Sequence, residues 1–129
     1  MTNQDWKKFL QTSREVLGKG SCHPYSSESW CAFTTFSSLI HGVHYFTLGL
    51  PDIEDCLESR TIDGGVWAQS IEYDDLAHII IPETFYWERT VQGFESGYKT
   101  QNIKLLSEEL LRQGIEHRLT DLVLEIKVY

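Results

Sequence analysis

The chain has 129 residues, of which 41% are hydrophobic and 23% are charged, as is usual for one soluble globular domain. Lys and Arg number 11 against 19 Asp and Glu, giving a net charge of −8. This balance argues against a nucleic-acid-binding protein, because such proteins carry a basic face. No apolar run approaches the roughly 18 to 20 residues that cross a bilayer, and no secretory signal opens the sequence. We therefore expect a cytoplasmic protein with no membrane contact.

Residues 3–17 predict an amphipathic helix. Apolar side chains, beginning with Trp6 and Phe9, recur at the spacing of one helix face. Thr2 or Asn3 can cap the start of this helix, and the glycines that follow residue 17 end it.

Shorter elements are expected over the next forty residues. In chain order we predict a loop over 20–29, a strand over 30–36, a turn over 37–42, a returning strand over 43–48, and a short helix over 52–59. The short helix follows Pro51, since proline is favoured at the first helical position.

The remainder of the chain predicts several strands and one more helix. In order these are a half-buried strand over 66–73, one or two strands over 76–90, a loop over 93–99, a helix over 102–113, and strands over 115–119 and 122–128. Pro82 marks an edge, a bulge or a break in its strand, because it has no N–H to donate.

Strands that cluster between helices favour an α+β fold with a mainly antiparallel sheet. The sequence contains no repeat and no linker long enough to separate two domains. We therefore expect a single α+β domain over residues 1–129, with amphipathic helices at about 3–17 and 102–113 and a short helix near 52–59.

The cysteines are few and odd in number, which is not the pattern of a disulfide framework. They are Cys22, Cys31 and Cys56, and we expect the last two to be small buried hydrophobes. A nucleophile–base pair of Cys22 and His23 is conceivable, but adjacent residues rarely orient their side chains toward each other, and no third group to orient the histidine is evident.

The sequence contains no motif that identifies an enzymatic reaction. His41 and His44 have metal-like spacing but no further ligand nearby. His78 and Glu83 would act as acid and base only if the fold joined them. We therefore expect neither an enzyme nor a bound metal or cofactor.

The negative charge is concentrated in residues 52–88, which we call the acidic segment. Ten acids and one base, Arg60, give it a net charge of −9, while residues 1–51 carry +1 and residues 89–129 carry zero. Its acids are Asp52, Glu54, Asp55, Glu58, Asp63, Glu72, Asp74, Asp75, Glu83 and Glu88. The segment also contains aromatic residues, which dominate the energetics of protein interfaces. Two interpretations stay open: a docking surface for a basic partner, or a solvated acidic face over an aromatic core.

In overall character the small acidic chain resembles the immunity proteins of bacterial polymorphic toxin and contact-dependent growth inhibition systems. The resemblance implies a stoichiometric inhibitor that binds and neutralises one basic toxin domain, often a nuclease, with no direct contact to nucleic acid. We expect the partner to contact Asp52, Glu54, Asp55, Glu58, Trp67, Glu72, Asp74, Asp75, Tyr86 and Trp87. Trp67, Tyr86 or Trp87 would anchor the partner if exposed.

Two other functions remain open. A small-ligand-binding or enzymatic α+β domain would have an aromatic-lined pocket that uses His41, His44 or His78. A DNA mimic would use its carboxylates in place of phosphates and would inhibit several unrelated DNA-binding proteins. The sequence leaves the oligomeric state open.

Overall fold

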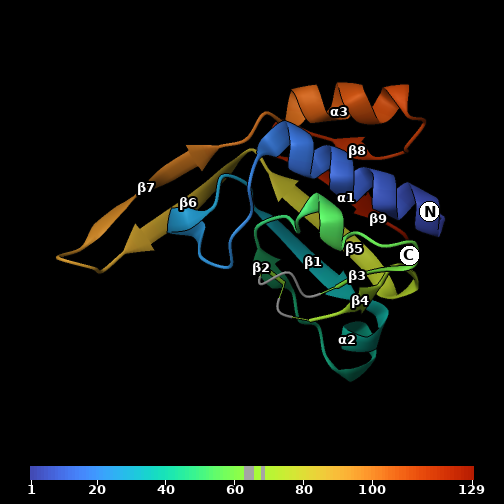
Figure 1. The fold of residues 1–129 in the computed structure, drawn as a ribbon, viewed down its shortest axis with the longest axis horizontal. Helices are drawn as coiled ribbons and strands as arrows, with labels where there is room; N and C mark the ends of the chain where they lie inside the picture. Colours follow the sequence, from blue (N-terminus) through green and yellow to red (C-terminus); the bar gives the residue numbers. More distant parts are fainter. Residues whose placement is uncertain (63–65, 68) are drawn as a thin grey trace.

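A five-stranded antiparallel sheet with the two long helices on one face organises the molecule (Figure 1). The computed structural model describes residues 1–62, 66–67 and 69–129. The strand order is β2-β1-β5-β9-β8. The bounds are β1 Cys31–Thr35, β2 Phe46–Leu48, β5 Leu76–Pro82, β8 Arg118–Leu119 and β9 Val123–Lys127. The chain is therefore the single α+β domain that the sequence predicts.

Helix α1, Asn3–Leu17, has the bounds expected from its periodicity. Thr2 is its cap: the Thr2 hydroxyl accepts from the Asp5 backbone N–H, and the Asp5 carboxylate accepts from the Thr2 N–H. These reciprocal bonds satisfy two backbone donors that the first helical turn leaves unpaired.

Helix α3, Ile103–Arg112, lies beside α1 (Figure 1) and matches the second predicted helix. The Asn102 side chain accepts from the Leu105 N–H at its start. The core lies between these two helices and the sheet. It includes Trp6, Phe9, Leu10, Phe33, Ile79, Ile81, Leu106, Leu110, Leu124 and Ile126.

The predicted short helix over 52–59 is wrong. The chain forms only the 3-10 turn η2, Ile53–Asp55, and then an isolated bridge joins Cys56 to Thr61. Cys56 points inward from this bridge and is buried, as is Cys31 on β1. Burial raises the pKa of both thiols to about 12, and the nearby Asp55 carboxylate adds to the shift at Cys56, so both stay protonated and act as small hydrophobes, as expected.

Three other local predictions are also corrected. Residues 37–42 lie in a short helix instead of a turn: α2, Phe36–His41, begins where the Thr35 hydroxyl accepts from the Ser38 N–H. The returning strand is confined to 46–48. Among the described residues of the predicted strand over 66–73, only β4, Ile71–Glu72, is a strand, and it pairs with β3, Arg60–Thr61. Residues 63–65 and 68 lie outside the described part of the chain.

The predicted loop over 93–99 is in fact mostly a strand. β7, Glu95–Thr100, pairs with β6, Thr84–Arg89, and the resulting hairpin, which we call the arm, projects from the body (Figure 1). Glycine at position 97 lets the Trp87 indole lie across the opposite strand, because a Cβ there would meet the ring at 3.1 Å. Trp87 thus supplies the packing that Gly97 lacks.

The remaining turns are η1, Pro24–Ser26, and η3, Tyr73–Asp75. The first lies beneath the arm, where Lys99 Nζ donates to the carbonyls of Pro24, Tyr25 and Ser27 at 2.9–3.1 Å. The second leads into β5 and carries two of the predicted contact acids.

Candidate functional site

The residues predicted to form one contact surface lie in two separate regions. Those from Asp52 to Asp75 surround η2, β3, β4 and η3, whereas Tyr86 and Trp87 lie on the arm, which extends away from that region (Figure 1). The structure therefore does not bring Tyr86 and Trp87 to the predicted acids.

The acids around η2 are largely occupied within the chain. Asp52 Oδ1 lies 3.1 Å from Arg14 Nη2, and Glu58 Oε1 lies 2.6 Å from Lys7 Nζ, so α1 supplies a cation to each. Asp55 bonds through its backbone carbonyl to the Ile62 N–H. Glu54 is exposed and has no basic partner among the described residues. These ion pairs reduce the charge that η2 offers to another molecule.

A second group of predicted acids converges on one surface depression, which we call the acidic hollow. Glu72, Asp74 and Asp75 line it together with Arg60, and its volume is about 510 Å³. Arg60 Nη2 donates to Glu72 Oε1 at 3.0 Å. Asp74 is exposed and has no basic partner in the described part of the chain. The hollow already holds one guanidinium and keeps one carboxylate unpaired.

Asp75 has a structural role within this hollow. Its carboxylate accepts from the Ser37 N–H at 3.1 Å and from the Ser37 hydroxyl at 3.0 Å, at the start of α2. A carboxylate at a helix start satisfies a free N–H of the first turn. Asp75 thus fixes α2 against η3 and gives the hollow one rigid wall.

Trp67 is a core residue and not an exposed anchor. It is 2% exposed, stacks on Phe33 with ring centroids 4.2 Å apart, and donates its indole N–H to the Gly49 carbonyl at 3.0 Å. A buried indole with a satisfied N–H contributes to packing, so Trp67 does not contact a partner directly.

The arm carries the other two predicted aromatic residues on opposite faces. Trp87 is half-buried over Gly97, near the Lys99 ammonium. Tyr86 is 45% exposed on the outer face, where its ring meets that of Tyr98 at 5.4 Å and its hydroxyl donates to Glu88. Tyr86 is therefore the accessible member of the predicted anchors.

Sequence reasoning missed a polar cluster on the sheet face opposite the helices. His78 Nδ1 lies 2.7 Å from the Tyr45 hydroxyl, and His78 Nε2 lies 3.8 Å from Glu125 Oε2. Glu125 also approaches Arg118 at 3.6 Å. Burial lowers the pKa of His78, and burial together with a hydrogen bond to Tyr129 raises the pKa of Tyr45 to about 12. No local motif signals the cluster, because its members come from four separate segments.

The three histidines considered for a ligand site have different surroundings. His41 is exposed at the end of α2, His44 packs its ring against Phe46, and His78 is 8% exposed beneath Tyr45 and Tyr129. Glu83 lies past the end of β5 and is not a partner of His78. Over residues 1–62, 66–67 and 69–129, no group of three or more His, Cys, Asp or Glu side chains is placed to hold a metal ion.

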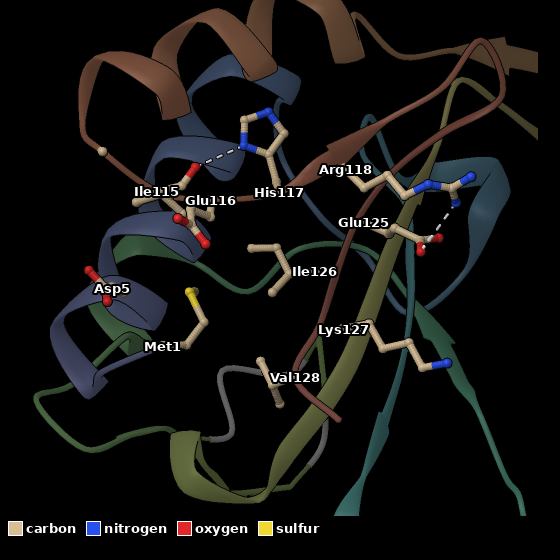
Figure 2. Close-up of a pocket in the computed structure, with 11 residues that line it drawn as sticks. Met1, Asp5, Ile115, Glu116, His117, Arg118, Glu125, Ile126, Lys127 and Val128 are labelled. Carbon is tan, nitrogen blue, oxygen red and sulfur yellow. Dashed lines mark hydrogen bonds and ion pairs between the residues drawn. The ribbon is translucent and has the colours of Figure 1, made fainter.

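Another depression, of about 740 Å³, follows β9 beyond the end of β8. Figure 2 shows Arg118, Glu125 and Lys127 on one side of β9 and His117 and Ile126 on the other. The groove is thus the open edge of a sheet with charges of both signs. It does not gather the acids of the predicted contact surface.

Beside this groove, a serine and a histidine join α3 to the chain before β8. Ser107 Oγ lies 2.6 Å from His117 Nε2, and His117 Nδ1 lies 2.9 Å from the Ile115 carbonyl. Because a carbonyl only accepts, Nδ1 carries a hydrogen and donates it to Ile115, and the Ser107 hydroxyl can donate to or accept from Nε2. Ser107 is buried on the inner side of α3, so this pair fastens two segments together.

Comparison with protein-family models, with curated proteins and with solved structures gave no match. Within the described residues, no helix has the length and apolarity needed to cross a membrane.

Proposed function

We propose that this chain is a stoichiometric inhibitor of the immunity-protein kind, which neutralises a basic toxin domain of the nuclease class and performs no catalysis itself. The observation that carries the proposal is the convergence of Glu72, Asp74 and Asp75 on the acidic hollow. The net charge of −8 supports the choice of a basic partner, since complementary charge steers association and selects partners.

The hollow suits the side chain of an arginine or a lysine. Carboxylates accept paired hydrogen bonds from a guanidinium, and Arg60 already donates one hydrogen bond to Glu72. Asp74 is the carboxylate left for an incoming cation, and Asp75 is held in position by Ser37. A basic nuclease domain presents cations where it binds phosphate, so occupying them with carboxylates would block its substrate.

Two experiments test the proposal. The first recovers the partner, and the second asks whether this chain protects cells from the partner's toxicity. Tagged protein is used to capture its partner from native cells at low salt and at high salt. We expect one basic protein near 1:1 stoichiometry, weakened by salt, whose toxicity on expression is suppressed by this chain. Recovery of several unrelated DNA-binding proteins would instead indicate a DNA mimic, and a basic partner whose activity is unaffected would contradict the inhibitor function.

The hollow itself is tested with the double variant Glu72→Gln/Asp74→Asn. Neutralising both groups should slow association with the recovered partner about tenfold and flatten its salt dependence. The matched control is Glu116→Gln/Asp121→Asn, which neutralises two exposed acids outside the hollow and changes the net charge equally. Equal effects of the two variants on association would show that the hollow is not part of the interface.

A further inference from the structure

The outer edge of β7 is an unpaired sheet edge on a projecting element. The arm is a two-stranded sheet of β6 and β7. The η1 turn lies near β6, and its carbonyls bind Lys99 on the arm's inner face. Tyr98 on the outer face is 72% exposed. Such an edge presents free N–H and C=O groups to any extended strand that fits it.

The orientation of those backbone groups follows from the pairing. The Gln101 N–H donates to the Glu83 carbonyl at 2.6 Å, and residues alternate between the two sides of a strand. Gly97 and Lys99 therefore direct their backbone groups toward β6. Ser96 and Tyr98 direct theirs toward the open edge.

The sequence of β7 is complementary to itself about Gly97. When two copies of the strand lie antiparallel with Gly97 facing Gly97, Glu95 of each copy lies opposite Lys99 of the other, and Ser96 lies opposite Tyr98. Shifting the centre to Ser96 or Tyr98 removes the opposition of Glu95 and Lys99. The centred register also aligns the outward backbone groups of Ser96 with those of Tyr98, as an antiparallel hydrogen-bonded pair requires.

The Lys99 ammonium binds three backbone carbonyls. It has no carboxylate partner in the described part of the chain. Glu95 of a second copy would supply the missing negative charge on the same face, in addition to the contact that Glu95 makes with Arg89. Opposite charges on directly facing strand positions stabilise the pairing. The edge of β7 is thus matched in charge to its own copy.

We propose that two copies of this chain associate through β7, antiparallel about a twofold axis at Gly97, to form a four-stranded intermolecular sheet. The pairing places two Tyr86–Tyr98 pairs on one continuous outer face and brings Phe94 of each tip, 65% exposed in the single chain, beside Thr100 of the other copy. An interface confined to two arms is below the size of permanent dimers, so the association is a concentration-dependent equilibrium.

The test is the mass of the purified chain across concentration, measured by sedimentation and light scattering. We expect the average mass to rise from 15.0 kDa toward the dimer mass as the concentration approaches millimolar. The variant Ser96→Lys/Tyr98→Lys should remain a monomer, because facing lysines on an edge repel. A wild-type chain that stays monomeric at all concentrations overturns the proposal, whatever the outcome of the partner experiments.

The matched control is Thr84→Lys/Tyr86→Lys, which makes equivalent substitutions on β6, on the same face of the arm but away from the open edge. It should associate like the wild type, and far-ultraviolet circular dichroism verifies that both variants fold. Loss of association in the control as well would assign the effect to added charge and not to the β7 edge, and would contradict the pairing.

The register has its own test in a Cys22→Ser background, which removes the exposed native thiol. Ser96→Cys and Tyr98→Cys chains are oxidised separately and as a mixture. The mixture should form a mixed disulfide faster than either chain alone forms its own, because Ser96 faces Tyr98 across the axis. Equal rates in all three samples would refute the Gly97-centred register.

Discussion

His78 lies on the middle strand of the sheet with a hydrogen-bonding partner on only one side of its ring. Nδ1 is 2.7 Å from the Tyr45 hydroxyl, while Nε2 is buried without a hydrogen bond and 3.8 Å from Glu125. Burial lowers the pKa of His78 below 6.5, although the Glu125 carboxylate opposes this shift. The folded protein therefore holds His78 neutral where the unfolded chain begins to bind a proton.

This difference predicts how stability depends on pH. As pH falls below 6.5, the unfolded chain binds the His78 proton first, so the free energy of unfolding decreases. The contribution is complete above the unfolded pKa and is lost as pH falls from there to the lower folded pKa. Urea unfolding at pH values on both sides of 6.5 gives the free energy of unfolding as a function of pH. This pH dependence should be shallower for His78→Gln than for the wild type. His41→Gln, at an exposed site, is the control, and parallel slopes for all three proteins would contradict the assignment.

At the residue scale, the sequence predicts which groups are charged but not which of them remain available. The acids of residues 52–58 are evident in the sequence, but their cations, Arg14 and Lys7, are 38 and 51 residues away from Asp52 and Glu58. The same holds for Trp67, whose indole N–H is satisfied by Gly49. The two ion pairs depend on how α1 packs on the sheet, and the Trp67 bond depends on how the chain folds back on Gly49. No local pattern encodes either.

A few contacts hold the arm against the rest of the molecule. A two-stranded hairpin is marginally stable in water by itself. This one is fastened to the chain before β1 by Lys99, which donates to three carbonyls, and by Phe85, which stacks on Trp30 at 5.7 Å. These contacts set the direction in which the arm projects.

Replacing Lys99 with Met should therefore loosen the arm and leave the core intact. The change keeps the apolar stem but removes all three charge-assisted hydrogen bonds. We expect amide hydrogens of residues 84–100 to exchange faster, while those of β1 and β5 keep their protection. Lys104→Met, at an exposed position on α3, is the control. Unaltered exchange in the arm would mean that the Phe85–Trp30 stack and the Gln101 side-chain bonds to Trp30 and Pro82 hold it without Lys99.

The sequence predicts best the elements whose apolar residues recur at a regular spacing. α1 and α3 have apolar residues at helical spacing and polar caps, so both were correctly placed. β7 was missed because Ser96, Gly97 and Lys99 are poor strand formers, and the strand exists through its pairing with β6 and the cover that Trp87 gives to Gly97. The helix expected at 52–59 failed because Cys56 instead bridges to Thr61.

For the whole molecule, the net charge of −8 is a cost to folding that internal ion pairs only partly offset. Arg14, Lys7 and Arg60 each neutralise one acid, but Glu54 and Asp74 have no basic partner among the described residues. Exposed ion pairs contribute little individually, whereas repulsion acts among all the excess acids.

Moderate sodium chloride should consequently raise the melting temperature at neutral pH by a few degrees. The variant Glu54→Gln/Asp74→Asn should melt higher at low salt and respond less to added salt, because it removes two of the repelling charges. Thermal unfolding across a salt series measures both effects. A melting temperature that falls as salt is added would show that ion pairs outweigh repulsion.

The two ends of the chain lie near each other, since Met1 and Val128 line the same groove beside β9. Figure 1 shows both ends on the side of the body opposite the arm. Any tag, dye or surface attachment joined at either end therefore leaves the arm pointing outward and unobstructed. Immobilised copies would present β7 to solution in a uniform orientation. Labels attached at the two ends would lie close together, so each would report on the same region of the molecule.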